Sequence, residues 1–436
     1  MTSSRHTATF PADIANASGR ETTNRVVALF VVYMCIATIL DYRLVFILNC
    51  LLGLKLSTKR ETAPKPPLVG GVAVLFMIAL SLVVGLFSSY SLVQVFRDFV
   101  YYLMPFSYCA AAGYFAKRLM HEDDVLTSLM YASFAVAVIT FAQGALSAST
   151  STGGLSVNSF TANEMIAYPV VFLLIRPSGW NFFKKKPFMA AVIVAFCLAM
   201  TVLILSRTTL LFILLILVIA HAASGNSAGT IGKIIFISFI VAILTLCLVP
   251  ESTMNSFVGK ITNSFTEMSS VNIWTQDTIV QNWRGYELDC AFSDFDKADV
   301  FTKLFGRGFG YLLPVNGLEY LVTDEAGGIN TLHNGYISVL IKNGLFGLAL
   351  LVIFFAVNIA RAYRVAKQER SYSRQLALAV AVAIAVCSYF ITGVFSPSAM
   401  YVFVVPFYLF ASIEGSGSEL TQRGQSRNGR NLRNND

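Results

Sequence analysis

Charged residues are scarce in this chain, and their scarcity excludes a soluble globular fold. Asp, Glu, Lys and Arg make up 13% of the 436 residues, whereas 56% of the residues are hydrophobic. A soluble domain usually carries about a quarter charged residues. The composition therefore predicts a polytopic membrane protein whose polar residues mark its working surfaces.

Cysteine provides neither a disulfide framework nor a thiolate metal cage. All seven cysteines except Cys290 lie inside apolar segments. A cleavable secretory signal is also missing, because the first apolar segment begins only after Arg25 and no small-residue cleavage pattern follows it. The net charge of +8 does not indicate nucleic-acid binding, since the basic residues fall between the apolar segments, as in the cytoplasmic loops of membrane proteins.

Apolar segments long enough to suggest membrane spans recur along the chain. They cover about residues 26–40, 44–54, 68–87, 97–116, 123–146, 161–176, 188–205, 208–223, 232–250, 334–360, 376–395 and 399–413. The second is short and is separated from the first only by residues 41–43, so these two are either separate spans or one bent span. The sequence predicts an all-α polytopic fold of about 12 transmembrane helices.

The basic residues set the predicted orientation, because Lys and Arg concentrate on the cytoplasmic side. With both termini inside, most of the 32 Lys and Arg residues fall on the inner face. The predicted organisation is a cytoplasmic tail at 1–25, spans one to nine at 26–250, a large extracytoplasmic loop at 251–332, spans ten to twelve at 333–414 and a disordered cytoplasmic tail at 415–436. The loop holds nearly half of the 24 acidic residues, so we expect a folded acidic element there.

Two stretches of the large loop carry local structural patterns. The first, QNWRGYELDCAFSDF, predicts a short amphipathic helix over the membrane mouth, with one face formed by Trp283, Tyr286, Cys290 and Phe295. The second, FGRGFG, has three glycines that allow positive φ or a close backbone approach: Gly306, Gly308 and Gly310. It is not a Rossmann or P-loop motif, because no strand precedes it and no Lys-Ser/Thr follows.

His333 is the candidate catalytic residue. Of the four histidines, it is the one predicted to face outward, where the polar loop meets the apolar segment that begins HNGYISVLIKNG. Histidine accepts protons near neutral pH, although a histidine at a membrane boundary can also be an interfacial polar residue without chemistry. The adjacent Asn334 either supports the site or caps the following helix.

Arg207 and Arg284 are the candidate phosphate-binding residues, because guanidinium groups bind phosphate oxygens in bidentate fashion. Arg207 interrupts two apolar runs in ILSRTTLL, where a charge is costly unless it is paired or functional. The alternatives are an Arg207 that snorkels at a helix end and an Arg284 paired locally with Glu287. Arg307 is a supporting candidate.

Acidic residues within the predicted spans are few. Glu164 lies near the outer start of span six and is a further supporting candidate, and Asp98 lies near the outer start of span four. A proton-coupled transporter is expected to show a chain of carboxylates across the membrane. The absence of such a chain disfavours a transporter.

These motifs together resemble the O-antigen ligase and Wzy-type polymerase superfamily of bacterial envelope glycosyltransferases. The resemblance covers most of the chain: the many spans, one large outer loop late in the sequence, the pair Ser206 and Arg207, Arg284 before an acidic aromatic helix, FGRGFG, and HNGYISVLIKNGLFGL from His333. It implies a metal-independent and cofactor-free transferase of the GT-C-like class. Such an enzyme works on the periplasmic side of the bacterial inner membrane.

The resemblance also implies roles and partners. By motif match, Arg207 and Arg284 would bind the diphosphate of an undecaprenyl-diphosphate-linked glycan donor, and His333 would activate the acceptor hydroxyl. The acceptor would be another glycan for a polymerase of exopolysaccharide or O-antigen, or lipid A core for an O-antigen ligase. Membrane lipids, a flippase and a chain-length regulator would be the other partners. We expect a polymerase, with the ligase as the near alternative.

Two further functions remain open at this stage. A solute or lipid-linked-oligosaccharide transporter would place polar groups at mid-membrane between discontinuous helices. A peptidoglycan-type polymerase would use an acid of the outer loop, such as Asp277 or Asp289.

Overall fold

The computed structural model describes residues 12–58, 70–119, 121–150, 163–175, 180–204, 206–224, 274–315, 328–369, 371–391, 393–395 and 401–413. Within these ranges the chain is almost entirely helical, and its one sheet consists of two short strands. The expected all-α class is therefore confirmed. The predicted span at 232–250, the predicted C-terminal tail, parts of the large loop and residues 1–11 of the predicted N-terminal tail lie outside the described residues, whereas residues 12–25 form the start of α1.

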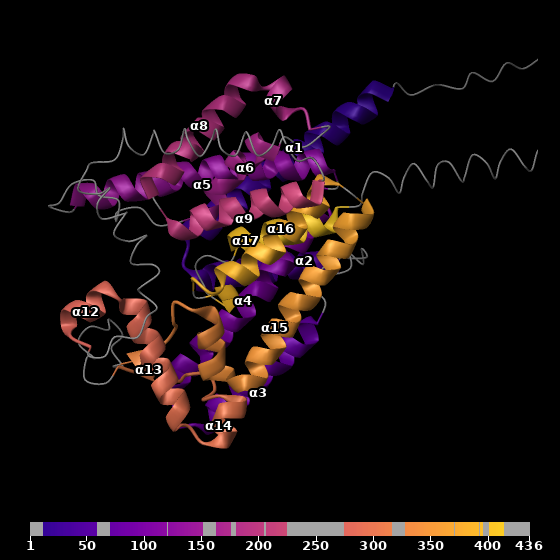
Figure 1. Cartoon of the computed structure of the whole chain (residues 1–436). Helices are drawn as coiled ribbons and strands as arrows, with labels where there is room; N and C mark the ends of the chain where they lie inside the picture. The colour runs from indigo at the N-terminus through magenta and orange to yellow at the C-terminus, as the bar shows by residue number, and fades with distance from the viewer. Residues whose placement is uncertain are drawn as a thin grey trace, which may run out of the picture.

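The described helices follow one another along the chain as labelled in Figure 1. In the first half they are α1 Ala12–Ile39, α2 Tyr42–Thr58, α3 Gly71–Phe87, α4 Leu92–Ala116, α5 Glu122–Thr150, η2 Glu164–Ile166, α6 Ala167–Ile175, α7 Phe182–Lys185, α8 Pro187–Ile204 and α9 Arg207–Ser224. The second half has α12 Gln276–Gln281, α13 Trp283–Lys297, α14 Val300–Phe305, β1 Leu313–Pro314, β2 Gly328–Ile329, α15 Gly335–Glu369, α16 Tyr372–Cys387, η4 Gly393–Phe395 and α17 Tyr401–Ser412. Every predicted apolar segment that lies within the described residues contains a helix.

Three helices among the described residues are long and apolar enough to cross a membrane: Glu122–Ser147, Pro187–Ile204 and Gly335–Glu369. Shorter apolar helices of 10–17 residues accompany them, including Gly71–Phe87 and Tyr372–Cys387. At 1.5 Å per residue, a 17-residue helix covers about 25 Å of a hydrocarbon core of about 30 Å. The helices are compatible with a membrane protein, while the number of spans stays a prediction.

α1 and α2 are two helices rather than one bent rod. The chain leaves helical geometry between them at Leu40 and Asp41. The Tyr33 hydroxyl on α1 donates to Asn49 Oδ1 on α2 at 2.9 Å, across a separation of 16 residues. In one continuous helix, 16 residues would span about 24 Å. The chain therefore turns back at Asp41, so the segment forms two helices, while their crossing of a membrane as separate spans stays a prediction.

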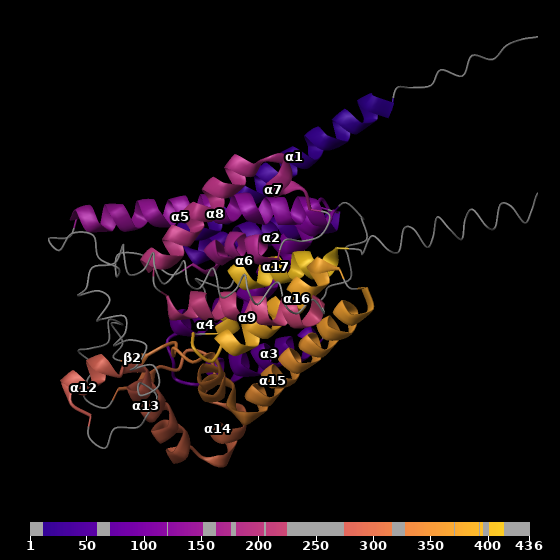
Figure 2. The same ribbon diagram turned by 45° about the horizontal axis from the view of Figure 1, so that its top comes forward.

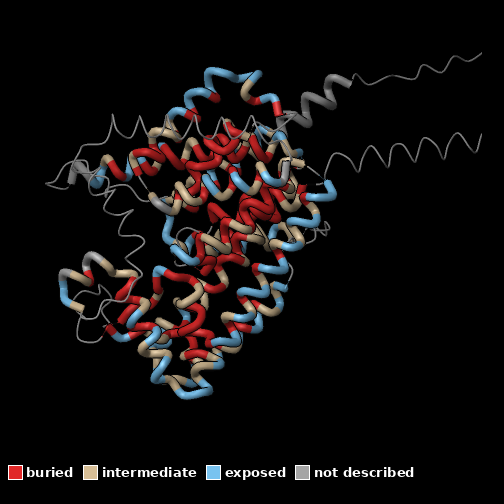
Figure 3. The backbone as a smooth tube through the Cα atoms, in the orientation of Figure 1, coloured by how far each residue is buried: buried red, intermediate tan, exposed pale blue. Residues whose placement is uncertain are grey.

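The buried centre of the molecule lies in the helical bundle (Figure 3). α17 is buried at every residue from Tyr401 to Phe410, and α6 is buried almost as completely. Helices that are apolar on every side have no polar face to turn outward, so other helices enclose them. Aromatic contacts connect these layers, such as Phe212 on α9 against Phe403 on α17 at 5.0 Å between ring centroids.

The described part of the large loop forms a small helical unit with its own apolar core. Figures 1 and 2 both show α12, α13 and α14 gathered at one end of the molecule, with α15 running from there toward the other end. The core of this unit includes Tyr286, Cys290, Leu313, Ile329 and Leu332. Trp283 and Phe295 pack against it, so the predicted apolar face of the 283–297 helix is confirmed.

α15 has a kink at Gly344, where φ is 68° and ψ is −172°. The kink interrupts the helix that the sequence predicted as one continuous segment, because this backbone conformation is not helical and is open mainly to glycine. The FGRGFG turn packs against the break: Arg307 N–H donates to Ile341 O and Gly308 N–H to Lys342 O, both at 2.9 Å. The turn thus satisfies carbonyl groups that the kink leaves without helical partners.

The three glycines of this turn all have positive φ, between 82° and 86°. A Cβ at Gly306 would lie 2.4 Å from the backbone nitrogen of Asn343, and one at Gly308 would lie 2.6 Å from the nitrogen of Gly85. The prediction of positive φ and close backbone approach is therefore confirmed.

Candidate functional site

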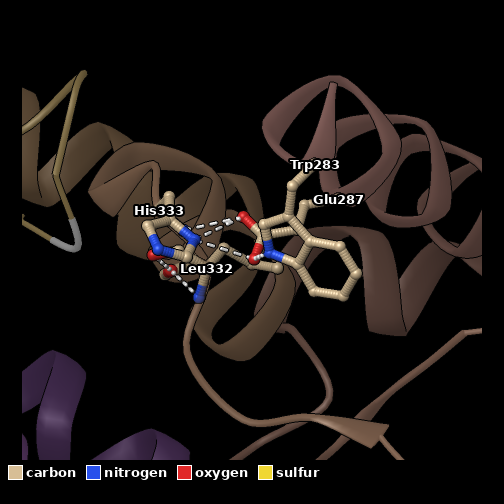
Figure 4. A network of polar contacts seen from close by, with 5 residues as sticks. Trp283, Glu287, Leu332 and His333 are labelled. Carbon is tan, nitrogen blue, oxygen red and sulfur yellow. Dashed lines mark hydrogen bonds and ion pairs between the residues drawn. The ribbon is translucent and has the colours of Figure 1, made fainter. Parts of the chain in front are cut away.

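His333 forms a pair with Glu287 of α13. Its Nδ1 lies 2.9 Å from Oε1 and 3.0 Å from Oε2 of the carboxylate. The His333 backbone N–H also donates to Oε2 at 3.0 Å, and Trp283 Nε1–H donates to Oε1 at 2.7 Å. The Glu287 side chain is 4% exposed and that of His333 is 50% exposed. A buried carboxylate therefore holds one edge of a half-exposed imidazole (Figure 4).

This hydrogen-bond pattern assigns the tautomer of His333. An ionised carboxylate only accepts hydrogen bonds, so Nδ1 carries the proton that faces Glu287. In the neutral imidazole, Nε2 is then the nitrogen with a free lone pair. Figure 4 shows this second ring nitrogen pointing away from Glu287. The arrangement can accept a proton at Nε2 and can stabilise the resulting imidazolium through the carboxylate.

The local fold brings the two residues together from 46 positions apart in the chain. β1 and β2 pair in antiparallel register, with Leu313 opposite Ile329. This pairing places the segment before His333 against the same apolar core that α13 packs on. Asn334 then starts α15, because its Oδ1 accepts from Tyr336 N–H and Ile337 N–H, both at 3.1 Å. Asn334 is thus a helix cap that holds the backbone next to His333.

Arg284 lies on the same helix as Glu287, α13. It precedes Glu287 by three residues, and side chains at this spacing occupy one face of a helix. The Arg284 side chain is partly exposed, and the Glu287 carboxylate that the sequence offered as its local partner is hydrogen-bonded to His333 and Trp283. Arg207 is the first residue of α9, and its side chain lies outside the described part of the structure.

The supporting candidates have structural partners of their own. Arg307 forms an ion pair with Asp294, with Nη2 to Oδ1 at 2.8 Å, and its guanidinium lies over the ring of Tyr311. Burial lowers the pKa of Arg307, but the hydrogen bonds and charge of Asp294 outweigh it and raise the pKa overall. For the Tyr311 phenol, burial is the main cause of a raised pKa. Arg307 therefore fastens the glycine turn to α13.

Glu164 is buried in η2, and no contact among the described residues joins it to His333. Tyr372 at the start of α16 bonds to Ile175 at the end of α6, at 3.4 Å. Gly335 N–H, in contrast, donates to the carbonyl of Ser388, just past the other end of α16. The start of α6, with Glu164, therefore lies toward the same end of the bundle as His333.

A second carboxylate pair lies nine residues along the chain from His333. Lys342 Nζ donates to Asp98 Oδ2 at 2.6 Å and to Asn330 Oδ1 at 2.9 Å. Gly310 N–H donates to the same Asp98 oxygen at 2.7 Å. The Lys342 and Asp98 side chains are only 7% and 1% exposed. This buried pair joins α4, the glycine turn and the first segment of α15.

Sequence reasoning missed the roles of Glu287 and Lys342. Glu287 was treated as a local partner of Arg284, although an acid on a mainly apolar helix face was a signal that it needed a buried partner. Lys342 stood in the apolar run ISVLIKNG, where a charge also requires a partner. Of the two rival acids, Asp289 accepts a hydrogen bond from Trp274 Nε1–H at 2.7 Å, and the Asp277 side chain is outside the described residues.

No group of three or more His, Cys, Asp or Glu side chains in the described ranges could hold a metal ion. The site at Glu287 and His333 contributes two such side chains, of which the carboxylate is already fully engaged.

No protein-family model matches the chain, and no curated protein matches it either.

Proposed function

We propose that this protein is a bacterial envelope glycosyltransferase that polymerises oligosaccharide repeat units carried on undecaprenyl diphosphate. The product would be exopolysaccharide or O-antigen. The observation that carries the proposal is the buried Glu287 carboxylate that holds Nδ1 of the half-exposed His333. A carboxylate that orients an imidazole is a recurrent arrangement for a general base. It supports the role that the family resemblance suggests for His333.

In the proposed reaction, His333 Nε2 accepts the proton of an acceptor hydroxyl as the hydroxyl oxygen attacks the anomeric carbon of the donor sugar. The bond between that carbon and the diphosphate oxygen breaks, and undecaprenyl diphosphate leaves with the bonding electrons. Arg284 and Arg207 bind the negative charge that develops on the leaving diphosphate. Glu287 stabilises the imidazolium until the proton is released.

The proposal places this end of the molecule at the periplasmic face of the inner membrane, where a lipid-linked donor and a glycan acceptor meet. The predicted span count and the acidic outer loop support this orientation. A ligase would use the same base and the same donor and would differ only in its acceptor, lipid A core.

A transfer assay with purified protein and a lipid-linked repeat-unit donor tests the mechanism. Because proton transfer by a positioned base contributes about 10²- to 10⁴-fold to rate, His333→Ala and His333→Gln should lose at least about 10²-fold in turnover while donor binding is retained. His121→Ala is the matched control, since His121 is exposed on the predicted inner side, and it should transfer normally. Substantial turnover by His333→Ala would contradict the mechanism.

Two further measurements separate the alternatives. Turnover of the wild-type protein should persist in EDTA, and its complete loss on chelation would rule out the metal-independent reaction. In a deletion strain, loss of long chains with single repeats remaining supports the polymerase. Long lipid-linked chains that never reach lipid A would assign the ligase instead.

A further inference from the structure

A cavity of about 260 Å³ lies at the other end of α15 from His333. Its wall combines residues of three helices: Arg361 and Glu369 of α15, Arg374 and Ala377 of α16, and Phe407 of α17. Figures 1 and 2 show this end of α15 far from α12–α14. The cavity therefore has no part in the chemistry proposed for His333.

The charged groups on its wall carry a net positive charge. Two guanidinium groups, Arg361 and Arg374, face one carboxylate, Glu369. Arg374 is held rigidly, because its Nε donates to Glu369 Oε2 at 2.7 Å and its Nη1 donates to the carbonyl of Ala411. Its side chain is only 13% exposed. These contacts fix the orientation of the guanidinium fork before any ligand arrives, which reduces the entropy cost of binding an anion.

A second cavity, of about 50 Å³, adjoins the first. Asn358 and Phe407 line both. The rest of its wall is apolar and includes Phe354, Phe355, Ala381 and Val404. A ligand that occupies both cavities must therefore have an anionic head and an apolar chain.

We propose that these two cavities bind an anionic phospholipid, with its phosphate at Arg361 and Arg374 and the upper part of one acyl chain in the apolar cavity. Basic pockets between transmembrane helices on the cytoplasmic side suit anionic lipid headgroups. The segment 361–374 is also the most basic of the predicted inner loops. This proposal requires insertion in a membrane, and it is independent of the transferase activity.

Native mass spectrometry of the full-length protein in detergent tests the site, with phosphatidylglycerol as the anionic probe and phosphatidylcholine of the same chains as the zwitterionic control. Phosphatidylglycerol should bind about tenfold more tightly, because the choline cation of phosphatidylcholine would lie near Arg361 and Arg374 and offset the attraction of its phosphate. Equal retention of the two lipids overturns the proposal.

Arg361→Gln should remove most of this preference, and Arg361→Lys should keep part of it, because lysine retains the charge without the planar fork. Arg364→Gln is the matched control: it removes the same charge from an exposed position of α15 that does not line the cavity. Arg361 is the better test residue, since Arg374 also anchors Glu369 and Ala411. Equal behaviour of Arg361→Gln and Arg364→Gln overturns the proposal.

Inorganic phosphate separates a lipid site from a free anion site. The lipid should raise the melting temperature of the wild-type protein at concentrations where phosphate has no effect, because only the lipid fills the apolar cavity. Ala381→Leu, which narrows that cavity, should weaken lipid binding several-fold. Equal stabilisation by phosphate and by the lipid would assign the cavity to a free anion and overturn the lipid proposal.

Discussion

His333 and Lys342 lie nine residues apart in the chain, and each binds a buried carboxylate. The two pairs differ in how far the basic side chain is exposed to solvent. Lys342 and Asp98 are both enclosed, and the ammonium group is bonded to Asp98 and Asn330. His333 gives only one edge of its ring to Glu287 and is half exposed. The enclosed pair can hold elements together but cannot reach a substrate, whereas the half-open pair can exchange a proton.

The comparison shows how exposure separates the roles of two similar pairs. Both carboxylates also accept a backbone N–H, from Gly310 at Asp98 and from His333 itself at Glu287. Such bonds fix the carboxylates in place in both cases. What distinguishes the pairs is that a ring has two nitrogens on separate edges, so one can be bound while the other remains accessible.

The largest expected effect comes from breaking the enclosed pair. Lys342→Met leaves the Asp98 carboxylate buried without its counter-charge, and removing one partner of a buried pair costs about 3–5 kcal/mol of folding stability. The double variant Asp98→Asn/Lys342→Met should recover most of that loss, since Asn keeps an acceptor for Gly310 N–H. Thermal unfolding in detergent measures the stability of the single and the double variant. Equal destabilisation of the single and double variants would contradict a structural ion pair.

A smaller effect, on turnover alone, is expected from the half-open pair. Glu287→Gln keeps an acceptor for Trp283 but removes the charge that stabilises the imidazolium, so kcat should fall about 10²-fold with little change in donor binding. The kcat of Glu287→Asp, which retains a carboxylate, should fall less. Asp289→Asn is the control on the same helix, where the side chain is exposed and bonded to Trp274. A larger loss in Asp289→Asn than in Glu287→Gln would favour the peptidoglycan-type mechanism.

The smallest effect concerns an exposed carboxylate, Asp299, which caps α14 by accepting from Thr302 N–H at 2.9 Å. That hydrogen bond and the one from the Thr302 hydroxyl lower the pKa of Asp299 below its usual value. A carboxyl group whose pKa is lower in the folded state than in the unfolded state stabilises the fold at pH values above its unfolded-state pKa. This contribution is lost as the pH falls through its folded-state pKa. Amide exchange in α14 should therefore differ between wild type and Asp299→Ala at neutral pH, and the difference should shrink only below about pH 4, as the pH falls through the lowered folded pKa of Asp299. A difference that persists in acid would mean that the carboxylate charge has no part in the cap.

Local patterns along the chain were sufficient for much of the fold. The apolar face of α13 follows from helical periodicity, and Trp283, Tyr286 and Cys290 all reach the core of the loop unit. The positive φ of Gly306 follows from the turn chemistry of glycine. The kink at Gly344 was missed, because one glycine in a long apolar run does not break a helix unless other backbone occupies the space beside it. Here the carbonyl of Leu304 would lie 2.3 Å from a Cβ at this position.

The sequence by itself determined the helical class, the apolar segments and the prominence of His333, because these depend on composition and on neighbours within one or two helical turns. Only the tertiary structure decided the partner of each buried charge. Glu287 bonds to His333, 46 residues away, and Asp98 bonds to Lys342 across 244 residues. Periodicity carries no information about such distances. The partner of a buried carboxylate is set by which elements the packed core brings together, since each charge removed from water needs the nearest group that can compensate it.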